Sequence, residues 1–156
     1  MKRILQWVGG IALAGAILVG AAIFFGRIQV RAARPSAEVF VTQFYILLND
    51  GEYRRIYDQM GSSKFRQQAD YVQFEKFMRR VAEIFGKSTG RDNGEWGISW
   101  YAETGTFFTV RHSTARERGK TIETFTLERD GTGWKLLGYY VYSPDLLSTS
   151  DHVPLQ

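Results

Sequence analysis

The chain has 156 residues, with 20 Lys and Arg, 16 Asp and Glu, two His and no Cys. This length suits one domain plus an appendage. The lack of cysteine excludes a disulfide framework, a thiolate metal site and a cysteine nucleophile, and two histidines are too few for a histidine-rich metal site. We therefore expect no metal and no cofactor.

The isoelectric point of about 9.4 arises at the N-terminal end of the chain. Five of the 20 cationic side chains flank one apolar segment: Lys2, Arg3, Arg27, Arg31 and Arg34. The other 15 face 16 acidic side chains, so the rest of the chain is near neutral. A nucleic-acid-binding domain concentrates cations, because counterion release supplies much of its affinity. We therefore interpret the cations between Arg111 and Lys120 as solvated hairpin charges, and we expect no nucleic acid partner.

The apolar segment ILQWVGGIALAGAILVGAAIFFG, residues 4–26, predicts a transmembrane helix, and we assign residues 1–26 to a membrane anchor. At about 1.5 Å per residue it reaches ~34 Å, which is enough to cross a hydrocarbon core. The alternative is a cleaved signal peptide, but the apolar region of a signal peptide is shorter than this segment and is followed by a small-x-small cleavage site. The short basic tail before the segment favours a cytoplasmic N-terminus. We expect a single-pass protein of the bacterial inner membrane with a periplasmic C-terminal domain.

A basic linker, residues 27–35, precedes a domain that we expect over residues 36–143. Ser36 is a fair N-cap for a first helix, which Asn49-Asp50-Gly51 ends with a glycine suited to a left-handed C′ position. The stretch GEYRRIYDQM predicts a second, short helix. Asp70 caps a third helix, whose apolar residues recur every three or four positions as far as Gly86.

Beyond Gly86 the apolar period shortens to two. Residues 87–94 are polar and predict a loop. Alternating side chains then predict four strands, at about 96–101, 107–113, 122–129 and 134–142. Helices followed by strands indicate an α+β fold, with about three helices packed on one face of a curved four-stranded antiparallel sheet. The tail, residues 144–156, is expected to be loosely ordered.

The last predicted strand is apolar on both faces. With regular alternation, one face holds Trp134, Leu136 and Tyr140, and the other holds Leu137, Tyr139 and Val141. Since helices cover only one face of the sheet, the second must meet a protein, a ligand or other aromatic side chains. We take Leu137, Tyr139 and Val141 as candidates for a protein interface.

The chain has a helix ending in NDGEYRRIYD, a helix ending in GK and a closing ETFTLERDGTGWKLLGYYV. This order resembles the nuclear transport factor 2-like (cystatin-like) superfamily, and above all its small bacterial members of unknown function. The matching positions, mostly turn and core residues between 36 and 142, are Asp50, Gly51, Tyr53, Tyr57, Glu123, Asp130, Gly131, Trp134, Lys135, Leu136 and Gly138.

The resemblance implies a cone, in which a strongly curved sheet wraps around helices. Some members of this superfamily are isomerases, dehydratases or cyclases with an acid or a His–Asp pair inside the cone. Many are not catalytic and pair through the open sheet face, and others are scaffold modules behind a single membrane helix. The resemblance brings no set of functional residues with it, because fold transfers further than function.

His112 and Glu123 are the candidates for catalysis. A two- or four-residue turn near Arg118-Gly119 would place them on one face of neighbouring strands, where a buried imidazole beside a carboxylate can act as a base. A three-residue turn would separate them. The alternative is a strand-end pair with no catalytic role. The sequence has no phosphate-binding glycine loop, no serine elbow and no metal-ligand spacing, so we favour a protein that is not an enzyme.

Three functions are consistent with these patterns. We favour a membrane-anchored interaction or scaffold module of the envelope, which pairs with itself or with an envelope protein through the open sheet face. The second is a pocket for a lipid or another hydrophobic small molecule, lined by Trp96, Trp100, Phe107, Trp134 and Tyr140. The third is an isomerase or dehydratase that uses His112 and Glu123.

Overall fold

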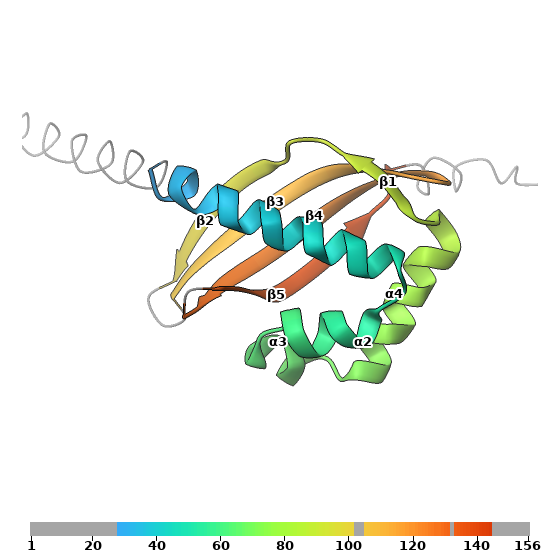
Figure 1. The fold of residues 1–156 in the computed structure, drawn as a ribbon, viewed down its shortest axis with the longest axis horizontal. Helices are drawn as coiled ribbons and strands as arrows, with labels where there is room; N and C mark the ends of the chain where they lie inside the picture. Colours follow the sequence, from blue (N-terminus) through green and yellow to red (C-terminus); the bar gives the residue numbers. More distant parts are fainter. Residues whose placement is uncertain (1–27, 102–104, 132, 145–156) are drawn as a thin grey trace, which may run out of the picture. The chain divides into compact units, whose positions relative to one another are not determined.

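The computed structural model describes residues 28–101, 105–131 and 133–144. It divides the chain at Pro35–Ser36, and the part from Ser36 onward is an α+β domain with helices packed on an open antiparallel sheet (Figure 1). The expected anchor, residues 4–26, and the expected loose tail from residue 145 onward lie outside the described residues. Within the described ranges no helix is both long and apolar enough to span a membrane.

The first helix of the domain was expected to begin at Ser36, but residues on both sides of Pro35 are helical, from 28 to 49. The fixed φ of proline suits a helix, and its ring removes one backbone hydrogen bond. The C-terminal end follows the prediction. Gly51, at φ 74°, donates its N–H to the Leu48 carbonyl, and the next N–H bonds the Leu47 carbonyl. These two bonds are a Schellman cap, which a left-handed glycine at C′ completes.

Shorter and longer helical segments follow the first helix. The short helix α2 (Tyr53–Arg55) runs into a π-helical turn (Ile56–Met60), and α3 (Ser63–Gln68) comes next. The long helix α4 (Tyr71–Phe85) is the third predicted helix, and the Asp70 side chain caps it by accepting the Gln73 N–H at 2.8 Å, as expected. Its buried residues repeat at helical spacing, which accounts for the accuracy of this prediction.

In the part of the chain that the structure describes, the sheet has five strands, where four were expected. They are β1 (Ser88–Arg91), β2 (Glu95–Tyr101), β3 (Gly105–Arg116), β4 (Gly119–Asp130) and β5 (Gly133–Tyr142). Strands β3, β4 and β5 are hydrogen-bonded in sequence order, and both β1 and β2 pair with β3. The missed strand is β1, which lies at the sheet edge and reads STGR. It lacks the apolar alternation that marks a half-buried strand.

One face of the sheet, the covered face, packs against the helices (Figure 1). The Phe44 ring from the first helix meets Phe125 of β4 edge-on at 5.0 Å and Tyr139 of β5 at 4.9 Å. From α4, Phe77 also contacts Tyr139, at 6.2 Å. Aromatic pairs at these distances add to the free energy gained by burying apolar surface.

A β-bulge at Leu137 changes which residues of β5 reach the covered face. Thr126 pairs with Gly138, but the next residue of β4, Leu127, pairs with Leu136, so β5 carries one extra residue. An extra residue reverses the alternation beyond it. The expectation that Tyr139 faces away from the helices is therefore wrong, because Tyr139 follows Leu136 onto the covered face.

The β3–β4 turn consists of two residues, Glu117 and Arg118, and it packs on the C-terminal end of α4. The Arg118 guanidinium donates to the backbone carbonyls of Ala82, Glu83 and Ile84, and its backbone N–H bonds the Phe85 carbonyl. The Ala82 carbonyl also accepts the Gly86 N–H, but the last carbonyls of a helix generally lack a partner within it, so a cation there both caps the helix and opposes its dipole.

We predict that Gly51→Ala lowers the free energy of unfolding by about 1–2 kcal/mol, because an L side chain is strained at positive φ. No atom lies within 4 Å of a Cβ at this position, so the loss would report backbone strain alone. Urea denaturation of the purified protein measures it. Gly90→Ala is the matched control, since Gly90 also has open space but no positive φ. Equal losses in the two variants would contradict the prediction.

Candidate functional site

A cluster of buried polar side chains lies on the covered face, between β3 and β4. Alternate residues of the two strands supply it, and all are 5% exposed or less: His112, Thr114, Arg116, Thr121 and Glu123. The cluster exists because the two-residue turn brings the polar ends of both strands to the same face. This is one of the two turn lengths that the sequence required for His112 and Glu123 to share a face.

The Glu123 carboxylate is the centre of the cluster. One oxygen accepts from two nitrogens of the Arg116 guanidinium, at 2.8 and 2.7 Å, and from the Thr121 hydroxyl at 2.6 Å. The other oxygen accepts from the hydroxyls of Tyr45, at 3.0 Å, and of Tyr139. A buried carboxylate with a cation and three hydroxyl donors has its charge and its lone pairs satisfied.

The surrounding groups respond to this charge. Burial, reinforced by the neighbouring Glu123 charge, raises the pKa values of Tyr45 and Tyr139 well above the usual range. For Arg116, burial alone would lower the pKa, but the Glu123 carboxylate outweighs it and the pKa is raised. The arrangement therefore holds an ionised Arg116–Glu123 pair beside two neutral phenols.

His112 sits next to this network. Its Nδ1 lies 3.2 Å from the backbone oxygen of Asp92 and 3.4 Å from the Asp92 carboxylate. A Cβ at Gly94 would overlap the imidazole, so only glycine lets the loop close over it. Within the described ranges the buried Nε2 has no hydrogen-bond partner.

Asp92 was not a candidate from the sequence, although the Asp92-Asn93-Gly94 turn is a visible signal for it. Its carboxylate accepts the N–H groups of Gly94, at 3.0 Å, and of Ser113, at 3.1 Å. Partial burial would raise its pKa, but these backbone N–H groups, with His112, lower it. Asp92 therefore ties the β1–β2 loop to β3 above His112.

This geometry does not make His112 and Glu123 a catalytic pair. They are direct cross-strand partners, as the sequence allowed. The hydrogen bonds of Glu123, however, go to Arg116, Thr121 and two tyrosines, while His112 Nδ1 faces Asp92. A general base needs an open path to the proton that it takes, and both side chains are fully buried.

The five aromatic pocket candidates do not form one lining. Trp134 is buried, packs edge-on against Phe108 at 4.9 Å and donates its indole N–H to Ser36 at 2.9 Å. Phe107 is also buried, but the register places it on the opposite face, beneath Lys64. Trp96 is half-buried, Tyr140 is 63% exposed, and the Trp100 side chain lies outside the described residues. The expectation that Tyr140 shares a face with Trp134 is wrong because of the bulge.

The bulge also changes the face of the sheet on which the three interface candidates lie. Tyr139 points into the buried cluster, and Val141 pairs with Glu123, so both lie on the covered face. Leu137 is the half-buried bulge residue itself. The expectation that these three side chains form the open face is therefore wrong.

One of the expected hairpin cations, Arg116, is not a solvated surface charge, and another, Arg118, is exposed but bonded to the chain. Arg116 is 5% exposed and pairs with Glu123, and Arg118 caps α4. Each forms hydrogen bonds with other groups of the chain, and the residues next to it in the sequence do not identify those partners. Arg111 is exposed, as expected.

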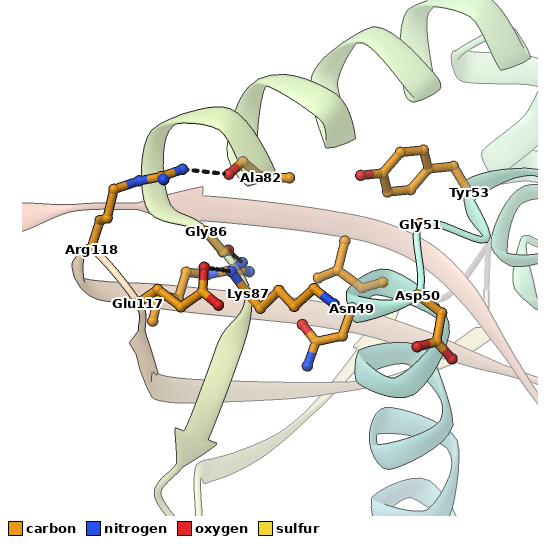
Figure 2. Close-up of a pocket in the computed structure, with 11 residues that line it drawn as sticks. Asn49, Asp50, Gly51, Tyr53, Ala82, Gly86, Lys87, Glu117 and Arg118 are labelled. Carbon is orange, nitrogen blue, oxygen red and sulfur yellow. Dashed lines mark hydrogen bonds between the residues drawn. The ribbon is translucent and has the colours of Figure 1, made fainter.

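A separate cavity of about 410 Å³ lies at the end of the domain where the first helix, α2, α4 and the β3–β4 turn meet (Figure 2). Leu48, Tyr53 and Ala82 supply apolar surface, while Lys87 and the turn supply charge. This cavity did not follow from the sequence, because its walls come from three stretches that are distant along the chain, residues 48–53, 82–87 and 116–118. Within the ranges that the structure describes, no group of three or more His, Asp or Glu side chains could hold a metal ion.

Comparisons of the chain with protein-family models, with curated proteins and with solved structures found no match. The resemblance to the nuclear transport factor 2-like superfamily therefore stays a prediction.

We predict that Arg116→Met lowers the free energy of unfolding by about 3–5 kcal/mol, because it leaves the Glu123 charge buried without its cation. Adding Glu123→Gln should recover part of that loss, since the charge then disappears. Urea denaturation of both variants measures the difference. The control is Glu128→Gln, whose partner Lys64 is about half exposed and whose loss should stay within about 1 kcal/mol. A double variant no more stable than Arg116→Met alone would contradict this account.

The two tyrosines also predict how stability changes in alkali. Their folded-state pKa values lie above the unfolded value of 10.0. The stability that the two tyrosines contribute is therefore fully present below about pH 10, and it is lost as the pH rises towards their folded-state pKa values. The free energy of unfolding should then fall by up to about 1.4 kcal/mol per pH unit for each tyrosine. Denaturation between pH 8 and pH 11 measures the slope, which Tyr45→Phe should reduce; an unchanged slope would refute this origin.

Proposed function

We propose that this chain is a non-catalytic interaction module, held at a membrane by residues 4–26, whose sheet binds a second copy of the chain. The observation that carries the proposal is a surface that we call the open face, the side of the sheet away from the helices. Its residues, as the strand register places them, include Thr109, Arg111, Ile122, Thr124, Thr126 and Tyr140.

The open face has the composition of a surface that pairs with a partner. Tyr140, on the edge strand β5 and opposite Thr124, is 63% exposed, and Ile122 and Tyr142 are paired beside it. Tyrosine supplies a large rigid contact area with a polar end and is enriched in interfaces. The small threonine side chains around it leave a flat surface on which another sheet can lie.

A second copy suits this face because the face carries both positively and negatively charged side chains. The exposed side chains of Arg111 and Glu95 are cross-strand neighbours at its margin. In a two-fold pair the same patch meets itself, so each copy can offer its cation to the other's acid. A membrane anchor would also hold two copies at a high effective concentration, so a weak contact would suffice.

The buried cluster supports a non-catalytic role. Its one carboxylate is neutralised by Arg116 and held by three hydroxyls, which is the condition of a structural ion pair. The cone shape and the periplasmic location implied by the sequence belong to the same proposal. An envelope protein other than a second copy remains the alternative partner.

The absence of cysteine allows a direct test on the full chain. A single cysteine at Thr124, on the open face, should give dimers with a short bismaleimide crosslinker. One at Lys76, on the exposed side of α4, should give several-fold fewer. Proximity of two copies of the open face is the reason for the difference, and gel electrophoresis measures it.

Adding Tyr140→Glu to the Thr124→Cys chain should reduce the dimer several-fold, because the interface would then bury two unpaired acids. Val72→Glu is the matched control, since Val72 is 71% exposed on α4 and receives the same change. Equal crosslinking from Thr124 and Lys76, or a Tyr140→Glu chain that crosslinks normally, would eliminate self-association through this face.

A further inference from the structure

The cavity in Figure 2 lies apart from the residues of the open face and has its own chemistry. Its volume of about 410 Å³ falls in the range of small-molecule sites, ~300–1,000 Å³. The walls are rigid, because Asn49 clamps Ser88 through two hydrogen bonds of 2.9 Å and Arg118 fixes the end of α4. A cavity with rigid walls needs little reorganisation to accept a ligand.

Tyr53 presents a hydroxyl to this cavity. The residue is only 7% exposed, yet within the described ranges its hydroxyl has no hydrogen-bond partner and is not sealed from solvent. Figure 2 shows the phenol directed from α2 towards the α4 wall. The Arg79 guanidinium lies 5.5 Å from the centre of the Tyr53 ring and supports it from α4. The hydroxyl is therefore a positioned donor whose partner must come from the cavity.

Lys87 supplies a charge to the same cavity. Its backbone is fixed, because its N–H bonds the Glu117 carboxylate at 3.1 Å and its carbonyl accepts the Glu117 N–H. Its side chain extends across the cavity towards Asn49 (Figure 2). Within the described ranges no acidic side chain pairs with its ammonium, which is thus available to a ligand.

The other charged groups of the lining are engaged or face outward. The Arg116 and Arg118 guanidiniums bond Glu123 and the last carbonyls of α4. Arg118 thereby covers carbonyls that would otherwise repel an anion. The Asp50 carboxylate points out of the cavity (Figure 2). The Glu117 carboxylate also lines the cavity, where one of its oxygens accepts the Lys87 N–H at 3.1 Å. The donors left to meet a ligand are the Lys87 ammonium and the Tyr53 hydroxyl, beside the apolar surface of Leu48 and Ala82.

We propose that this cavity binds a small organic carboxylate with an apolar body. The carboxylate accepts hydrogen bonds from the Lys87 ammonium and the Tyr53 hydroxyl, and the apolar body lies against Leu48 and Ala82. A charge-assisted bond to lysine gives most of the preference for an anion, and the tyrosine fixes its orientation.

The test uses 3-phenylpropanoate and its neutral analogue 3-phenylpropanamide, titrated into the full chain by calorimetry. We expect the carboxylate to bind with a dissociation constant of about 1 mM or lower and the amide about tenfold more weakly. Lys87→Met should weaken carboxylate binding about tenfold and leave amide binding unchanged. Tyr53→Phe, which keeps the ring and its Arg79 contact, should weaken it about threefold or more.

Lys76→Met is the matched control for the loss of a lysine charge, because Lys76 lies on the exposed side of α4 outside this cavity. Urea midpoints equal to that of the unaltered chain show that the variants are folded. Equal affinities for the acid and the amide, no binding of either, or a Lys87→Met chain that binds like Lys76→Met would overturn the proposal. None of these results depends on self-association through the open face.

Discussion

The buried pair of Arg116 and Glu123 is the constraint on which the rest of the domain depends. An ion pair inside a protein is tolerable only when its geometry and its remaining hydrogen bonds are satisfied. Here that requirement draws in the first helix through Tyr45, β5 through Tyr139 and the end of α4 through the Gly86 carbonyl. Four segments must therefore be in register before the charge is stable, which favours one arrangement of helices on sheet over its near alternatives.

Local patterns in the sequence were enough to predict most of the fold. The apolar spacing of α4, the caps at Asp70 and Gly51 and the alternation of β3 and β4 each depend on neighbours within a few residues. The missed strand β1 is polar and forms because β3 offers it a free edge, which is a tertiary cause. The two faces of β5 were misassigned for a similar reason, since the bulge at Leu137 is visible only in the pairing with β4.

The candidate site was less predictable than the fold. The shared face of His112 and Glu123 followed from the turn length, but the role of Glu123 depends on Tyr45, which lies 78 positions away in the chain. Arg116 and Arg118 look alike in sequence, yet one is buried against a carboxylate and the other caps a helix. The apparent apolarity of both faces of β5 is resolved by the bulge, which leaves threonines, Tyr140 and charged margins on the open face.

The cap that Arg118 places on α4 has a consequence for how the domain folds. Its bonds join residues 34 to 36 positions apart, so the last turn of the helix gains its partners only when the β3–β4 turn exists. A helix of this length is marginal by itself in water. The helix end and the β3–β4 hairpin are therefore expected to form in one cooperative step. The last turn of the helix then becomes stable through its contact with the hairpin and not through the helix alone.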